Sequence, residues 1–174
     1  YAVLPRVYQL AGSLPDVPLR AFEAKVRDLP KGTEAERLVV QRIGQDIFRR
    51  SLLEYWQHRC PLTGITEPEL LRASHIVPWS ECTGDAQRLD VHNGLLLSAL
   101  WDAAFDQALV TFDDEGRPVF SQWLGSEARE MLVWKEPLRL TDFHRMHLEH
   151  HRRRFEERLN VGPSNSSLAT FRSF

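Results

Sequence analysis

Hydrophobic residues recur at three- and four-residue steps from about residue 34 to residue 58, and this spacing predicts a long amphipathic helix. Thr33 and Glu36 have the Thr-x-x-Glu form of a capping box, which marks where the helix starts. Similar patterns predict three further helices, near 18–28, near 126–133 and at about 142–159.

Between these helices the pattern changes to short apolar runs that are typical of strands. Residues 69–77 and 94–98 are predicted to be strands joined by the polar loop 79–92, with a helix at 99–108 directly after the second strand. Runs on either side of Asp113-Asp114-Glu115-Gly116 predict a hairpin. A further short strand is predicted near 137–140. Helices combined with short strands in this order predict an α+β fold class.

The chain has 174 residues, of which 43% are hydrophobic, and this is enough for one domain with a core but not for two. Four prolines within residues 1–32 predict a linker or an arm from a preceding domain. Residues 33–160 are predicted to form one domain with its core at about 60–112. Residues 161–174 are predicted to be a flexible tail. Because the chain begins at Tyr1, we expect it to be a fragment of a larger protein.

Composition narrows the possible environments and partners. A formal net charge of -2 argues against binding nucleic acid by overall charge alone, so such binding would have to be local or assisted. No apolar run has the length of a membrane span and no signal peptide is evident, which predicts a cytoplasmic protein without a membrane partner. Cys60 and Cys82 are the only cysteines, so neither a disulfide framework nor a structural zinc is expected.

Polar residues concentrate in the stretch 71–106, at positions where a plain hydrophobic core would not need them. His75 ends the first predicted strand, Asn93 precedes the second, and Asp102 and Asp106 lie one turn apart on one helix face. A neutral histidine can take a proton from water, an asparagine can brace a loop, and carboxylates can hold a divalent cation. Metal-assisted phosphodiester hydrolysis uses these groups.

Three segments together resemble the HNH endonucleases, in the branch that lacks zinc cysteines and occurs in bacterial restriction and defence nucleases. The segments are Ala73-Ser74-His75-Ile76-Val77-Pro78, Asn93-Gly94-Leu95-Leu96-Leu97 and Phe105-Asp106. The resemblance covers about residues 42–112. It implies a ββα-metal (HNH) core flanked by N-terminal and C-terminal helices.

The resemblance also implies roles for individual residues. His75 would be the general base, Asn93 would brace the loop and orient His75, and Asp102 would complete the catalytic set. The implied metal ligands are Ser74, Asp102 and Asp106. Ser74 stands where many members have a histidine or aspartate ligand, and Asp102 stands where many have the last histidine. Oxygen ligands of this kind favour one divalent ion, Mg²⁺ or Mn²⁺, over zinc.

Each of these residues also has a purely structural interpretation. His75 could be a strand histidine bound to a backbone carbonyl, and Asn93 before Gly94 could simply form a turn. Asp102 and Asp106 could be solvated or ion-paired carboxylates. His92 is expected to lie in an exposed loop.

Four arginines are candidates for contact with nucleic-acid phosphates. Arg72 and Arg88 lie near the predicted site in the sequence, and an ion pair with Glu69 or Asp90 is an equal alternative for them. Arg152 and Arg153 lie in the predicted C-terminal helix, where a solvated face paired with neighbouring glutamates is an equal alternative.

The C-terminal helix also contains His147 and His151, which have the i, i+4 spacing of a two-histidine zinc pair. No Glu follows His147 and no third ligand is evident, so a packing helix is the preferred interpretation. Its predicted inward residues are Phe143, Met146 or His147, and Phe155.

These features predict a metal-dependent DNA endonuclease, the cleavage domain of a larger restriction or antiviral defence protein. Double-strand cleavage by one site per chain would need a homodimer or two events. Phosphate contacts carry no base information, so a recognition domain outside this chain is expected to supply sequence preference. The alternatives are an inactive HNH-fold module that binds DNA or protein, and a nuclease acting on RNA or structured DNA.

Overall fold

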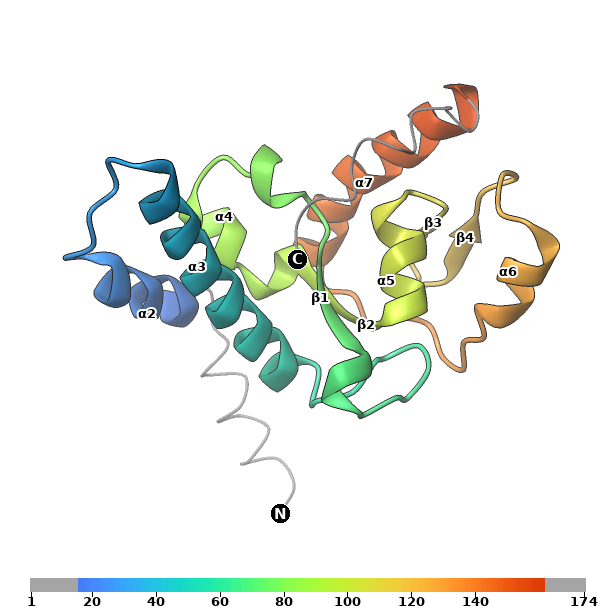
Figure 1. Ribbon diagram of the computed structural model, residues 1–174. Coiled ribbons are helices and arrows are strands. Elements are labelled where there is room, and N and C mark those ends of the chain that lie inside the picture. Colours follow the sequence, from blue (N-terminus) through green and yellow to red (C-terminus); the bar gives the residue numbers. More distant parts are fainter. Residues whose placement is uncertain (1–15, 162–174) are drawn as a thin grey trace, which may run out of the picture.

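The computed structural model describes residues 16–161 and confirms the α+β class, because helices are combined with two small antiparallel sheets (Figure 1). The helices are α2 (Asp16–Val26), α3 (Glu34–Tyr55), α4 (Asp85–Leu89), α5 (Ala99–Asp106), α6 (Ser126–Met131) and α7 (Asp142–Val161). The strands are β1 (Leu71–His75), β2 (Gly94–Ser98), β3 (Val110–Phe112) and β4 (Pro118–Phe120). Single turns of 3-10 helix are η1 (Pro68–Leu70), η2 (Trp79–Glu81) and η3 (Val91–Asn93).

Strands β1 and β2 form the centre of the molecule and pair antiparallel, with Ser74 opposite Leu95 and His75 opposite Gly94. Helix α3 packs on this sheet and so does α5, and β2 is buried along its whole length between them (Figure 1). Successive side chains of a strand point to opposite faces. Ser74 and His75 are therefore directed toward different helices.

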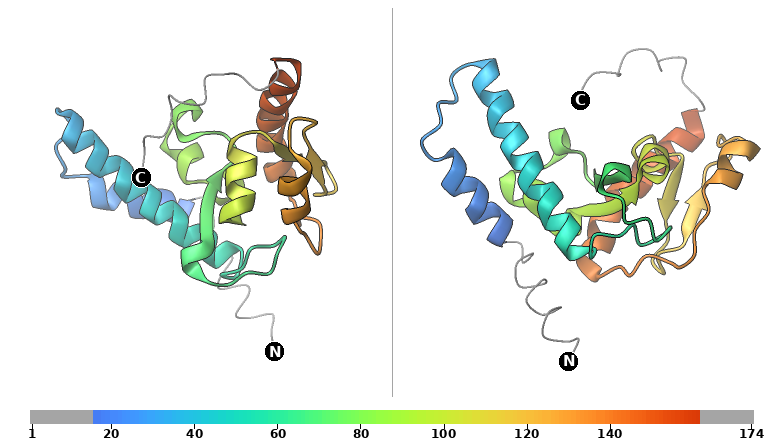
Figure 2. Two further views of the ribbon diagram at one scale, coloured as in Figure 1. Left: turned by 45° about the vertical axis from the view of Figure 1, so that its right-hand side comes forward. Right: turned by 60° about the horizontal axis from the view of Figure 1, so that its bottom comes forward.

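Helix α3 begins at the predicted capping box: Glu36 N donates to Thr33 Oγ1 at 3.3 Å, and Thr33 N donates to Glu36 Oε2 at 2.9 Å. Its buried face packs against α2, which lies beside it in both views of Figure 2. The apolar side chains in this contact are Phe22, Val26, Ile47, Phe48 and Leu52. The segment 16–26 thus shares a core with the predicted domain, and the domain boundary at residue 33 stays a prediction.

Gly94 allows α3 to approach the sheet at the position opposite His75. A Cβ atom there would lie 2.5 Å from Phe48 Cζ and 2.8 Å from Leu52 Cδ1, closer than real carbon atoms come. Any larger residue would have to displace the side chains of Phe48 and Leu52. The glycine therefore sets the distance between Phe48 and the end of β1.

The larger core lies between the first sheet, α5, the β3–β4 hairpin and α7. Its largest fully buried side chains include Leu71, Leu95, Trp101, Phe105 and Phe112. Helix α7 contacts both β3 and η3, so it joins the hairpin to the loop that follows α4. The hairpin and helix α5 were both predicted from the sequence, and the structure confirms them.

Two predicted local structures differ from the observed ones. The segment predicted as a polar loop contains helix α4 and the 3-10 turns η2 and η3. Helix α4 forms where Gly84 O accepts from Arg88 N and closes a helical turn. No strand forms at 137–140, where Leu138 N donates to Gly116 O as a single bond without a ladder.

Helix α7 packs as predicted, but the prediction of its inward residues was partly wrong. Phe143 and Met146 are 59% and 57% exposed. The buried residues are His144, His147, Leu148, His151 and Phe155. His151 can take an inward position because both of its ring nitrogens have hydrogen-bond partners. His144 bonds to Thr141 through Nδ1, and its buried Nε2 has no partner among residues 16–161.

Residues 1–15 of the predicted arm and residues 162–174 of the predicted tail lie outside the described residues. None of the helices between residues 16 and 161 combines the length and the apolar character that crossing a bilayer requires.

Candidate active site

Ser74 and Asp102 meet on the α5 side of the central sheet. The Ser74 hydroxyl donates to Asp102 Oδ1. The pKa of Asp102 is raised overall, mainly by burial and also by the charge of Asp106. The hydrogen bond from Ser74 and the charge of Arg72 oppose this shift. The two helical carboxylates are therefore close enough to repel each other. A cation between them would relieve that repulsion.

Ser74, Asp102 and Asp106 are the residues that could hold a metal ion through their side-chain oxygen atoms. Within residues 16–161, no group of three or more His, Cys, Asp or Glu side chains is arranged to hold one. Asp102 and Asp106 supply two carboxylates, and the Ser74 hydroxyl is a third oxygen. This donor set fits a hard cation such as Mg²⁺ or Mn²⁺, which binds few protein oxygens and retains several waters.

His75 lies on the α3 side of the same sheet. Its ring stacks on Phe48, with centroids 3.8 Å apart and planes 16° apart, and its edge meets Trp79. Nε2 lies 2.8 Å from Arg88 O. A carbonyl oxygen can only accept, so Nε2 carries the proton and Nδ1 of the neutral ring has a free lone pair. In the described part of the chain, Nδ1 has no hydrogen-bond partner.

Burial lowers the pKa of His75 to about 4, although the bond to Arg88 O opposes this shift. The ring is therefore neutral at physiological pH. The side chain is only half-buried, so a water molecule can reach it. A neutral, accessible imidazole nitrogen is the group that a general base requires.

Asn93 is fully buried and connects the end of β1 to α4. Its Oδ1 accepts from Val77 N at 2.8 Å, and its Nδ2 donates to Gln87 O at 3.1 Å. Gln87 precedes Arg88, whose carbonyl holds His75. Asn93 thus braces the segment that orients His75 without a hydrogen bond to the imidazole, among the described contacts.

The predicted residues therefore form two half-sites on opposite faces of one strand end. Ser74, Asp102 and Asp106 lie on one side, and His75 with its Arg88 contact lies on the other. In residues 16–161, His75 makes no contact with either carboxylate. Because Ser74 and His75 are consecutive, their Cα atoms are about 3.8 Å apart. Both half-sites therefore lie at the same end of β1.

Two of the four candidate arginines flank these half-sites. Arg72 Nη1 donates to Glu69 O at 2.8 Å, a backbone contact and not an ion pair with the Glu69 carboxylate. Arg88 Nη1 pairs with Asp85 Oδ1 at 2.9 Å, so the alternative partner Asp90 was wrong.

The arginines of α7 have different roles. Arg152 donates from Nε to Phe112 O at 2.8 Å and pairs with Asp114 at 2.8 Å, so it attaches the hairpin to α7. Arg153 is exposed and has no ion pair within residues 16–161. Arg154 Nη2 donates to Asp106 O at 3.3 Å and thus lies at the carboxylate half-site.

Sequence reasoning missed the group that anchors the loop of the active site. Asp90 Oδ1 accepts from His92 N at 2.9 Å and lies 3.0 Å from His92 Nδ1, while Oδ2 lies 3.4 Å from His147 Nε2. Burial raises the pKa of Asp90, but the hydrogen bonds from His147 and His92 outweigh burial and bring it well below its usual value. His92 is 15% exposed, so its predicted exposed position was wrong. The sequence did contain a signal for this turn, because an Asp side chain often accepts from the backbone N–H two residues later, as Asp90 does from His92.

Comparison with known proteins identifies the same region of the chain as the one that contains the candidate site. Residues 60–113, about a third of the chain, match the family profile described as HNH endonuclease. This segment contains β1, β2, α5 and both half-sites. No curated protein matches the chain.

Proposed function

Because residues 60–113 match the HNH endonuclease family, whose members are nucleases, we propose that this chain is a metal-dependent DNA endonuclease with His75 as its general base. The observation that carries the proposal is the free Nδ1 of a neutral, half-buried imidazole whose Nε2 is tied to Arg88 O. That hydrogen bond selects the tautomer and leaves the lone pair of Nδ1 available to accept a proton.

In the proposed reaction, His75 Nδ1 takes a proton from a water molecule while the water oxygen bonds to phosphorus. The bond from phosphorus to the 3′ oxygen breaks, and the departing oxygen gains a proton from solvent. The products are a 5′-phosphate and a 3′-hydroxyl. The Arg88 carbonyl stabilises the positive charge that His75 acquires in this step.

Asp102, Asp106 and Ser74 are the proposed holders of one Mg²⁺ or Mn²⁺ ion. When bound, this ion would neutralise charge on the phosphate and on the leaving oxygen. Burial is the main cause of the raised pKa of Asp102, and the charge of Asp106 adds to it. A bound cation would offset both effects, which supports the assignment. Arg153 and Arg154 are proposed to contact flanking phosphates.

The wider role follows from the same features. A net charge of -2 leaves little general affinity for DNA, so we assign sequence recognition to another part of a larger restriction or defence protein. With one site per chain, cleavage of both strands would require a homodimer or two successive nicks.

Cleavage of supercoiled plasmid tests the proposal, with Mg²⁺, Mn²⁺, Ni²⁺ and EDTA in parallel. Wild-type protein is expected to nick the plasmid only with metal, and His75→Ala is expected to be inactive. His58→Ala is the matched control, because His58 is an exposed histidine paired with Glu54 on the surface. Cleavage by His75→Ala at the wild-type rate would overturn the assignment of the base.

A DNA-binding module without catalysis is the second candidate, and the small number of metal-ligand side chains within residues 16–161 favours it. This alternative predicts intact plasmid in every metal. It also predicts DNA binding that Arg153→Ala weakens and His75→Ala leaves unchanged.

A further inference from the structure

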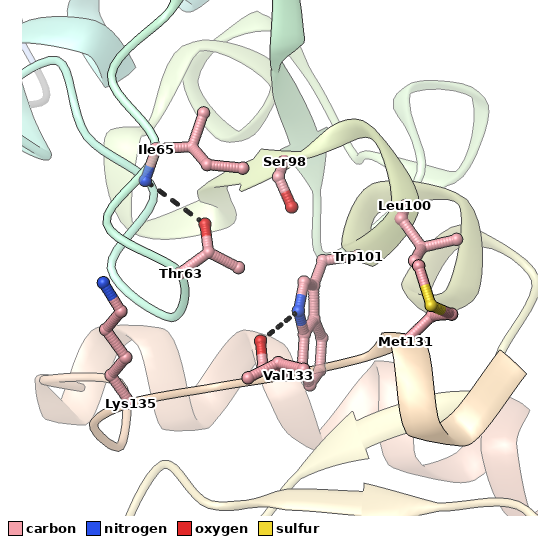
Figure 3. A pocket seen from close by; sticks show the side chains of 8 residues that line it. All are labelled: Thr63, Ile65, Ser98, Leu100, Trp101, Met131, Val133 and Lys135. Carbon is pink, nitrogen blue, oxygen red and sulfur yellow. Dashed lines mark hydrogen bonds between the residues drawn. The ribbon is translucent and has the colours of Figure 1, made fainter.

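A pocket of about 320 Å³ lies at the N-terminal end of α5, formed by the turn after α3, by α5 and by the segment that follows α6 (Figure 3). Its walls are mostly apolar and include Ile65, Leu100, Trp101, Met131 and Val133. The Trp101 indole is held in place because its Nε1 donates to Val133 O at 3.2 Å. The volume is at the lower end of the range for small-molecule sites.

Ser98 is the side chain that marks this pocket as a binding site. It is 6% exposed, and within residues 16–161 its hydroxyl has no hydrogen-bond partner. Ser98 occupies the N-cap position of α5, yet its side chain makes no capping hydrogen bond. Figure 3 shows its oxygen directed into the space beside Thr63 and Trp101. A hydroxyl that opens into a pocket and has no partner within residues 16–161 can form a hydrogen bond with a ligand there.

The other polar side chains of the pocket can donate hydrogen bonds, and Val133 O already accepts from Trp101. Thr63 Oγ1 accepts from Ile65 N at 3.3 Å, which leaves the hydroxyl proton free to donate. Lys135 makes no ion pair within the described part of the chain, and no acidic side chain lines the pocket. The first turn of α5 adds partial positive charge. These groups together favour an anion.

A second cation lies beside Lys135. A Cβ atom on Gly64 would be 3.5 Å from Lys135 Nζ and 3.8 Å from Arg59 Nη1, so both cations border the same glycine. Gly64 has a φ of 82°, which holds the turn in the shape that places them there. In residues 16–161 Arg59 also lacks an ion pair. One end of the pocket is therefore positively charged, and the other is apolar.

We propose that this pocket binds a small monocarboxylate with an aromatic or branched aliphatic body. The carboxylate would accept from Ser98, Thr63 and Lys135, and the body would lie against Trp101, Leu100 and Met131. An inorganic anion such as phosphate fits less well, because it would leave the apolar wall without contacts. The proposal is independent of nuclease activity, because none of these residues belongs to either half-site.

An NMR titration of the ¹⁵N-labelled chain with phenylacetate tests the proposal, with phenylacetamide as the neutral probe of equal shape. Phenylacetate is expected to shift the Trp101 indole N–H resonance saturably, with a Kd on the order of 1 mM for so small a ligand. The amide is expected to bind about fivefold more weakly. No saturable shift, or equal binding of the two probes, would overturn the proposal.

Variants at the charged end locate the site. Lys135 is exposed and has no ion pair within residues 16–161, so Lys135→Gln is expected to fold. This variant should weaken phenylacetate about fivefold and leave the weak binding of the amide unchanged. Ser98→Ala should weaken phenylacetate about threefold, and the exposed Lys31→Gln is the matched control with no effect. Wild-type affinity in Lys135→Gln would exclude this pocket as the carboxylate site.

Discussion

His75 and His151 occupy almost the same kind of environment in two different regions of the molecule. His75 stacks on Phe48 at 3.8 Å, and His151 stacks on Phe105 at 3.7 Å. Each Nε2 lies 2.8 Å from a backbone carbonyl oxygen, and burial lowers both pKa values to about 4. Both rings are therefore neutral and carry the proton on the same nitrogen.

The two histidines differ at the second ring nitrogen. His151 Nδ1 lies 3.0 Å from Thr111 Oγ1, whose hydroxyl can donate to it, and the side chain is fully buried. His75 Nδ1 has no partner among residues 16–161, and its ring is only half-buried. A histidine with both nitrogens bonded stabilises the fold, whereas one with a free, accessible lone pair can accept a proton. One missing hydrogen bond thus distinguishes a structural histidine from a candidate base.

The largest expected effect is on cleavage. His75→Gln should lower kcat/KM at least about 100-fold, because glutamine has no nitrogen that can accept a proton. His151→Gln should retain cleavage within about twofold per folded molecule, since within residues 16–161 His151 forms no hydrogen bond with a candidate active-site side chain. Plasmid nicking rates, normalised to folded protein by circular dichroism, measure both. Equal losses in the two variants would show that the free nitrogen of His75 has no special role.

Removing the charge of Asp102 tests the carboxylate half-site. His75 has this half-site on the other face of its strand, whereas His151 forms no hydrogen bond with its side chains within residues 16–161. Asp102→Asn should reduce Mn²⁺-dependent cleavage on the order of 100-fold, because a carboxylate is lost from the proposed cation site. Isothermal titration with Mn²⁺ should show weaker binding at the same time. Asp46→Asn, at an exposed position of α3, is the matched control. Unchanged Mn²⁺ affinity in Asp102→Asn would remove Asp102 from the ligand set.

Stability should respond in the opposite order to activity. His151→Gln is expected to lower the free energy of unfolding by about 2 kcal/mol, because buried partners at Thr111 and Phe105 lose their hydrogen bonds. His75→Gln is expected to cost about 1 kcal/mol or less, because only one hydrogen bond is made there. Urea unfolding of the two variants gives both values. A larger loss in His75→Gln would mean that His75 is mainly structural.

The pH dependence of stability separates the variants by the slope of stability against pH. The pKa values of His75 and His151 are about 4, and burial lowers that of His144 to about 3, against about 6.5 in an unfolded chain. Between pH 6.5 and 4 the unfolded chain takes up protons that the folded protein does not, so stability falls as the pH falls. His151→Gln should reduce this slope by up to about 1.4 kcal/mol per pH unit. Unfolding curves parallel to wild type across this range would contradict a neutral, buried His151.

Much of the fold follows from patterns along the chain. The Thr33–Glu36 capping box, the apolar spacing of α3 and the run 94–98 are local signals, and the structure confirms the elements that they predict. The segments that include His75, Asn93 and Asp102 were also recognisable, because their residue types and spacings resemble the HNH family. Their individual roles stay predictions.

The burial of residues that depends on contacts between distant elements could not be predicted from the sequence. Phe143 and Met146 are more apolar than His144 and His147, yet the histidines are buried, because Thr141 and Asp90 lie where their ring nitrogens need partners. Helix α4 was missed because the polar loop that contains it has no apolar period.

The sequence by itself determined most of the helices and strands and which residues carry ionisable or metal-binding groups, because these depend on periodicity within about 20 residues and on residue chemistry. Only the tertiary structure decided that Ser74 and His75 serve opposite faces of the sheet and that Arg88 O holds His75 Nε2. It also decided that Thr111 occupies the second nitrogen of His151 while that of His75 stays free. These choices depend on hydrogen bonds between groups 13 to 40 positions apart, which no local pattern encodes.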